Sequence, residues 1–168
     1  LRLEDGVPTE WSTDKIYDNL DRSRALQAYL LGIPIVNQVS MRNTLKEYGP
    51  VNTTNVIWEQ LVDSRTVELT ANDNVVYNFI WLDTTDGPLV VESPPDILGL
   101  IDDMWYRWVA DVGITGEDKG KGGKYLILPP GHTGDIPDGY IVVRPTTYGN
   151  WFPFRSFLNA EGDPKPGV

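Results

Sequence analysis

Four side chains suited to binding or acid–base chemistry lie close together in residues 102–112. They are Asp103, Trp105, Arg107 and Asp111. The stretch alternates in polarity and predicts one strand, in which alternate side chains share a face. Carboxylates beside an aromatic ring and a guanidinium are typical of surfaces that bind or cleave sugars. We therefore treat these four residues as the candidate ligand-binding site.

The same pattern has a purely structural explanation. A charged outer face opposite a core face is normal in sheets, and spacing alone does not bring two carboxylates together. Two hypotheses about function therefore stay open. One is a non-catalytic structural or ligand-binding module, with glycans as a candidate ligand. The other is a hydrolase that uses Asp103 or Asp111 as acid or base, with Arg107 holding the substrate.

Other catalytic and cofactor chemistry finds little support in the sequence. There is no cysteine, which removes thiol nucleophiles and disulfides. His132 is the only histidine, and it lies in a Gly- and Pro-rich turn, where we expect it at the surface. No nucleophile-elbow motif accompanies it. The Gly- and Lys-rich stretch 113–123 does not match a phosphate-binding loop. We predict no metal site and no cofactor, and expect the lysines of that loop to pair with Glu117 and Asp118.

Length and charge limit the class of protein. The chain has 168 residues, enough for one domain with its own core, and a net charge of -10. Such an acidic surface repels phosphate backbones, so we expect no nucleic-acid partner. No apolar run approaches the roughly 20 residues that a membrane span requires.

The first part of the sequence predicts helix, over about residues 9–47. Ile16, Leu20, Leu26 and Tyr29 recur at helical spacing. We expect a bend near Asn19. A stop or kink follows at Gly32–Pro34, because proline lacks a backbone donor, and a further helix occupies residues 35–47.

The rest of the sequence predicts strands. Candidate strands are 66–70, 75–82, 89–92, 102–112, 124–128, 140–144 and one or two within 146–157. The stretch 75–92 has the form of a hairpin, and 96–100 that of a helical turn. We expect the core to contain Trp58, Trp81, Trp108 and Trp151, and expect Arg144 and Arg155 to hold buried carboxylates. The predicted fold is mainly β with N-terminal helices, a β-sandwich or jelly-roll-like domain, with α+β as the alternative.

Several stretches together resemble one family. The most specific is 118–140, with Asp118-Lys119-Gly120-Lys121-Gly122-Gly123 and Pro137-Asp138-Gly139-Tyr140; others are residues 21–30, 69–72, 94–99, 102–105 and 161–166. This pattern is similar to the N-terminal domain of bacterial proteins that carry the domain of unknown function 1254. The turn at 72–75 departs from the family pattern, so no ligand role is carried over to it.

The resemblance implies a domain organisation and no established activity. Residues 1–158 would form the β-rich domain, and residues 159–168 a linker to a missing C-terminal domain. It also implies a homo-oligomer and a periplasmic or secreted location. Under the hydrolase hypothesis, the missing domain would share the carboxylate-based site.

Overall fold

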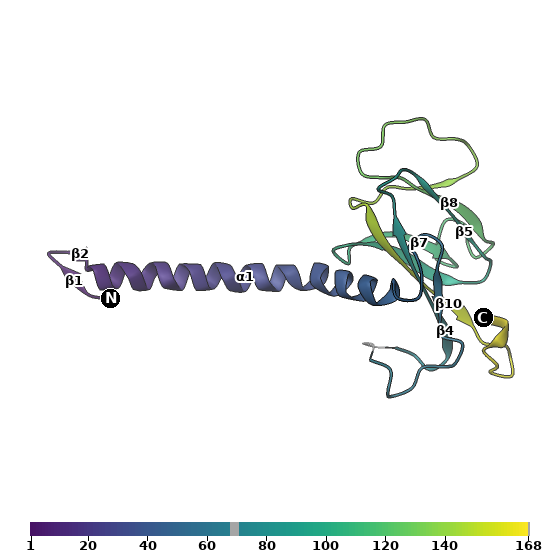
Figure 1. Cartoon of the computed structure of the whole chain (residues 1–168), viewed down its shortest axis with the longest axis horizontal. Coiled ribbons are helices and arrows are strands. Elements are labelled where there is room, and N and C mark those ends of the chain that lie inside the picture. Colours follow the sequence, from purple (N-terminus) through teal and green to yellow (C-terminus); the bar gives the residue numbers. More distant parts are fainter. Residues whose placement is uncertain (68–70, 168) are drawn as a thin grey trace. The chain divides into compact units, whose positions relative to one another are not determined.

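A computed structural model describes residues 1–67 and 71–167 of the chain (Figure 1). These residues divide into two compact units, 1–37 and 38–168, and each is described by itself. The first unit opens with an antiparallel pair of short strands, β1 (Leu3–Glu4) and β2 (Val7–Pro8). The long helix α1 (Glu10–Leu45) follows and ends in the second unit.

Helix α1 begins where the sequence predicts and continues through the expected stop. Thr9 caps it, since its Oγ1 accepts a hydrogen bond from the Ser12 N–H at 3.3 Å. Pro34 lies inside the helix, so the predicted stop at Gly32–Pro34, with a further helix after it, is wrong. Proline removes one backbone hydrogen bond and costs about 3 kcal/mol. The hydrogen-bonded turns on both sides outweigh that local cost.

A five-stranded antiparallel sheet forms the larger layer of the second unit. Its spatial order is β3 (Asn55–Ile57), β4 (Val75–Asp83), β10 (Gly149–Phe157), β6 (Leu98–Asp103), β7 (Trp108–Gly113). Strands β4 and β10 pair along their full length, with Trp81 opposite Trp151 and Tyr77 opposite Arg155. Strand β4 is rich in β-branched and aromatic residues and β10 in aromatic ones, and both kinds favour extended backbone.

A three-stranded sheet forms the second layer. It contains β5 (Leu89–Ser93), β8 (Gly123–Ile127) and β9 (Ile141–Val143), and β8 pairs antiparallel with β5 and parallel with β9. A short 3-10 helix, η1 (Lys165–Gly167), lies near the C-terminus. Among the described residues, no helix combines the length and the apolar character needed to cross a membrane.

The core lies between these two sheets. The larger sheet contributes Leu82, Ile101, Val112, Phe152 and Phe154, and the smaller one contributes Tyr125, Ile127 and Val143. The predicted class, mainly β and sandwich-like with an N-terminal helical segment, is confirmed.

The tryptophans do not belong to the cluster between the sheets, and of the four predicted for the core only Trp81 is buried, at 3% exposed. Trp81 and Trp151 alternate with the core residues Leu82 and Phe152, and therefore face the opposite side of the sheet. Trp58 packs edge-on against Phe79, with ring centroids 4.7 Å apart. Trp108 is 64% exposed. An aromatic-rich outer face is the consequence.

Three predictions of local structure need correction. Strands β4 and β5 belong to different sheets, so 75–92 is no hairpin. Residues 98–100 belong to strand β6 rather than to a helical turn. Residues 102–112 are the end of β6, a turn and β7, not one strand. The predicted strand 66–70 falls in part on residues 68–70, which lie outside the described residues. The strands expected at 124–128, 140–144 and within 146–157 are confirmed as β8, β9 and β10.

Candidate functional site

The predicted site residues surround a tight turn between β6 and β7. The Asp103 N–H donates to the Arg107 carbonyl at 3.0 Å, and the Tyr106 N–H donates to the Asp103 carbonyl at 3.0 Å. Tyr106 has a φ of 56°, the left-handed conformation that lets the chain reverse here. Local hydrogen bonding has therefore replaced the continuous strand that the alternating pattern predicts.

The Asp103 carboxylate organises this turn. The residue is only 1% exposed. Its Oδ1 accepts the backbone N–H groups of Trp105 at 2.8 Å and Arg107 at 3.1 Å. Its Oδ2 accepts Arg107 Nε at 2.7 Å and the Thr146 hydroxyl at 3.0 Å. Burial alone would raise the pKa of Asp103, but these hydrogen bonds, that from Arg107 foremost, hold it below its ordinary value.

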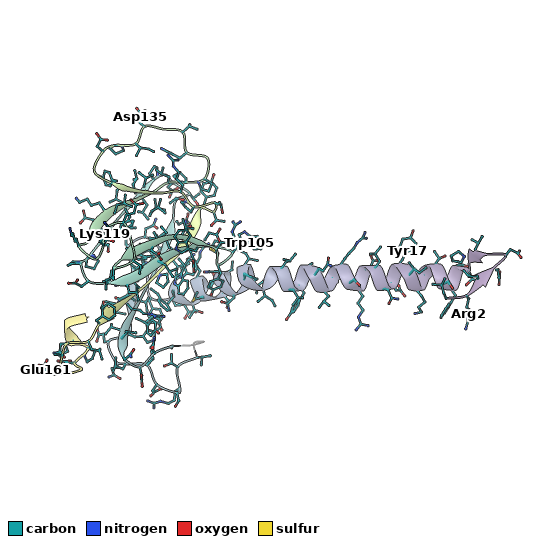
Figure 2. The ribbon with its side chains drawn as sticks, turned by 180° about the vertical axis from the view of Figure 1, so that it is seen from behind. Arg2, Tyr17, Trp105, Lys119, Asp135 and Glu161 are labelled. Atoms are coloured by element: carbon teal, nitrogen blue, oxygen red, sulfur yellow. The ribbon has the colours of Figure 1, made fainter. Side chains whose placement is uncertain are left out.

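Of the four predicted site residues, the structure brings two together. Arg107 Nη2 lies 2.7 Å from Asp103 Oδ2, so these two form an ion pair inside the turn. Trp105 projects from the same turn and is 45% exposed (Figure 2). Asp111 lies apart on β7, where its Oδ1 accepts the Trp108 indole N–H at 3.2 Å. Asp103 has its oxygens committed to the turn, whereas Asp111 borders an open pocket.

That pocket is a groove of about 520 Å³ on the outer face of the five-stranded sheet. Strands β4, β10, β6 and β7 contribute its lining. The apolar part is formed mainly by Tyr77, Phe79, Leu100, Trp151 and Pro153, and the charged part by Asp102, Asp111 and Arg155. We call this the sheet groove.

The sheet groove has a carboxylate with unusual surroundings. Asp102 is half-buried. In the described part of the chain, no residue donates a hydrogen bond to its side chain or forms an ion pair with it. Burial, with a smaller contribution from the neighbouring Asp103 charge, raises its pKa from 3.8 to about 6. Asp111 borders the same groove. The acidic end of the groove therefore holds a poorly solvated, unpaired carboxyl group.

A guanidinium lines the sheet groove as well. Arg155 lies over the Tyr77 ring, with its Cζ 5.4 Å from the ring centroid. Neither Arg155 nor Arg144 forms an ion pair with any described residue, so they do not hold the buried carboxylates of Asp103 and Asp118. The groove residues Asp102, Trp151 and Arg155 are absent from the predicted site. Alternation along β10 is the signal for two of them, since Trp151 and Arg155 share one face.

The Gly- and Lys-rich loop 113–123 has a structural role. Asp118 is buried there, and its Oδ1 accepts the Gly113 N–H at 2.9 Å and the Tyr125 hydroxyl at 2.7 Å. Burial and this bond raise the pKa of Tyr125 above its ordinary value. The sequence predicted an ion pair between Asp118 and the loop lysines, but no such pair forms among the described residues. Lys124 pairs with Glu92 at 2.9 Å.

The described residues do not meet the requirements of a metal site. Within residues 1–67 and 71–167, no three carboxylate or imidazole groups are placed to hold a metal ion. His132 is half-buried in the connection between β8 and β9, outside the sheet groove.

The fold and the groove define a two-sheet β module with an open face. Comparison with known sequences gives its family: residues 51–168 match the profile described as "Protein of unknown function (DUF1254)". The chain belongs to this family. No curated protein matches the chain significantly.

A solved structure shows the same fold. It is the crystal structure of the VPA0106 protein from Vibrio parahaemolyticus, with a TM-score of 0.60 and 19% sequence identity. The match covers 83% of this chain and 34% of the solved one. The chain thus spans about a third of the length of that relative.

Proposed function

We propose that this chain is a non-catalytic ligand-binding β module whose ligand lies in the sheet groove. The observation that carries this proposal is the composition of the groove. Apolar and aromatic side chains form its floor, and a few charged groups stand at its edges. Binding sites for small molecules have this composition, and their volumes are commonly about 300–1,000 Å³.

Binding is favoured over catalysis by the state of the carboxylates. The oxygens of Asp103 are occupied by four hydrogen bonds, which leaves this residue no free lone pair for a reacting proton. The Arg107 guanidinium is likewise bound to Asp103, within the turn. Among the lining residues of the groove there is no histidine or serine to form a nucleophile–base pair.

A hydrolase is the alternative, and one observation favours it. Asp102 has a pKa of about 6 and lines the same groove as Asp111, which pairs with Leu100 on β6. Two carboxyl groups that line one groove can divide the roles of acid and base in hydrolysis. Under this alternative, Asp102 takes the part that the sequence assigned to Asp103.

The groove is tested by a blocking substitution with a matched control. Leu100→Arg places a long charged side chain on the groove floor, and Val90→Arg places the same side chain on exposed β5. Both variants and the unmodified chain are titrated with short peptides, neutral oligosaccharides and fatty acids, by calorimetry. We expect at least one class to bind, and Leu100→Arg to weaken it at least tenfold while Val90→Arg leaves it unchanged.

Two results would overturn this proposal. One is the absence of binding for every class, and the other is equal binding by the Leu100→Arg variant. Turnover of ester, amide or glycoside substrates that Asp102→Asn abolishes would replace binding by the hydrolase alternative.

We also propose that the module works inside a larger exported, homo-oligomeric protein. Many apolar side chains of the first unit are more than half exposed, among them Tyr17, Leu26, Tyr29, Leu30, Leu31 and Val36. Exposed apolar surface of this kind marks interaction sites. The family resemblance supports a C-terminal domain and a periplasmic or secreted location. Light scattering of the whole natural protein tests assembly, and a monomer would contradict it.

A further inference from the structure

We propose that the sheet groove recognises a zwitterion, a short peptide with free ends. Its ammonium group would lie against Asp102 and Asp111, and its carboxylate against Arg155. This inference rests on the proposed function, because it names the ligand class of the same groove.

Strand register places opposite charges at the two ends of the groove. Arg155 and Trp151 are four residues apart on β10. On the neighbouring strand β6, Arg155 pairs with Leu98 and Trp151 pairs with Asp102. Four residues of strand span about 13 Å, so the guanidinium and the Asp102 carboxyl group start from backbone positions about that far apart. One sheet face therefore carries a positive and a negative end.

At the positive end, the described residues leave a guanidinium that can bind an anion. Arg155 stacks over Tyr77 at 5.4 Å, which holds the guanidinium plane in the groove, and no described carboxylate pairs with it. A guanidinium presents two parallel N–H donors to a carboxylate, an arrangement stronger than a neutral hydrogen bond. The terminal carboxylate of a peptide matches this geometry.

The negative end favours a cation. Asp102 has no hydrogen-bonding partner among the described residues, and Asp111 borders the groove beside it. An ammonium group donates three hydrogen bonds and neutralises part of this charge. The net charge of -10 attracts the cationic end and repels purely anionic ligands. A ligand with only one charge would leave one end of the groove unmatched.

The surface between the two ends is apolar. Phe79, Leu100 and Pro153 lie there, without a charged group among them. This floor suits the aliphatic side chains and Cα carbons of a peptide better than the hydroxyl groups of a sugar. An extended chain spans about 3.3–3.6 Å per residue, so three or four residues bridge the groove.

The experiment removes one charge at a time from the ligand. Calorimetry at about neutral pH compares tetraalanine with its N-acetylated form, its C-terminal amide, the doubly blocked form and maltotriose. We expect tetraalanine to bind best, and each single blocking group to weaken binding at least tenfold. Because the protein is unchanged in this series, folding of a variant does not affect the result.

Substitutions then assign each end. Arg155→Gln is expected to reduce the affinity for tetraalanine at least tenfold, and to have no effect on that for the C-terminal amide. Asp102→Asn should do the same for the ammonium end, with the N-acetylated peptide unaffected. Arg144→Gln and Asp135→Asn, at exposed positions outside the groove, are the matched controls (Figure 2 labels Asp135).

The pH dependence of tetraalanine binding is an independent test of the ammonium end. The charge that acts on Asp102 is that of Asp103, its neighbour on β6, which pairs with Arg107. Asp111 on β7 lines the same groove, and the β10 partner Trp151 does not titrate. Protonation of Asp102 at about pH 5 should weaken tetraalanine binding and leave the N-acetylated peptide unchanged.

The outcomes separate this inference from the proposed function. If maltotriose or the doubly blocked peptide binds as well as tetraalanine, and Leu100→Arg abolishes that binding, the groove is a binding site but the zwitterion is wrong. If none of these probes nor any other class binds, both proposals are wrong.

Discussion

The Asp103 side chain shows how a single carboxylate closes a turn. It accepts hydrogen bonds from two backbone N–H groups that follow it in the chain and from the Arg107 guanidinium. The sequence indicated that these residues belong together, but it placed them on one strand. Aspartate is a residue whose side chain competes with a strand for nearby backbone donors, and a period of two does not detect this competition.

Replacing Asp103 tests its structural role. Asp103→Ala leaves two backbone donors of the turn without acceptors, so the free energy of unfolding should fall by about 2–3 kcal/mol. Arg107→Gln retains the hydrogen bonds from the backbone N–H groups to Asp103, and the Arg107 guanidinium is exposed. The free energy of unfolding should therefore fall by about 1 kcal/mol or less. Urea denaturation measures both values. Equal losses, or none, would contradict this role.

Asp102 predicts a stability that depends on pH. Its pKa is raised to about 6 in the folded chain, so the folded state binds the proton more tightly than the unfolded state. This carboxyl group therefore lowers stability as the pH rises from about 4 to 6. After a discount for partial exposure, Asp102→Asn should stabilise the protein by on the order of 1 kcal/mol near pH 7.

The stability difference is measured by thermal unfolding of the unmodified chain and of Asp102→Asn across this pH range. The advantage of Asp102→Asn should disappear towards pH 4. Asp135→Asn, at an exposed loop position, should show no such trend. An advantage that is the same at every pH would show that desolvation of Asp102 is not its cause.

At the scale of elements, a buried hydrogen bond ties the loop 113–123 to a core residue. Tyr125 is a core residue of β8, and its hydroxyl donates to Asp118. Gly113 at the end of β7 has a φ of 86°, and a Cβ there would lie 2.0 Å from the Ile97 carbonyl oxygen. Only glycine fits this position, so the start of the loop is fixed by Gly113 and its middle by Asp118.

Tyr125→Phe tests that contact. The substitution keeps the ring in the core and removes only the hydroxyl donor, leaving the buried Asp118 oxygen without it. We expect the free energy of unfolding to fall by about 1–3 kcal/mol. Amide hydrogen exchange should accelerate in residues 114–121. Unchanged exchange in this loop would contradict the assigned role.

Strand positions were predictable, and strand partners were not. The β-branched and aromatic runs located β4, β8, β9 and β10, because local preference suffices there. The partner of β4 is β10, far along the chain, whereas the sequence pairs β4 with its neighbour. This choice depends on how two sheets enclose a core. In α1, helical turns on both sides override Pro34, which a local rule takes as a stop.

At the scale of the whole molecule, each face of the five-stranded sheet has its own function. The inner face packs against the smaller sheet, and the outer face bears the sheet groove. Aromatic content predicted a well-packed core, but Trp81 and Trp151 belong to the outer face. Of the predicted site only Asp111 borders the groove. Asp102 and Leu100 lie on β6 close to the predicted site, whereas the groove residues of β4 and β10 are distant in sequence and are brought there by strand register.

The central claim is that the outer face of the five-stranded sheet binds the ligand. Chemical-shift mapping of the isotope-labelled chain, titrated with tetraalanine, tests it most directly. We predict shifts of the Trp151 indole N–H and of the amides in β6 and β10 that border the groove, with little change at the Trp105 indole. Shifts centred on the turn at Trp105, or no shifts with any ligand class, would contradict it.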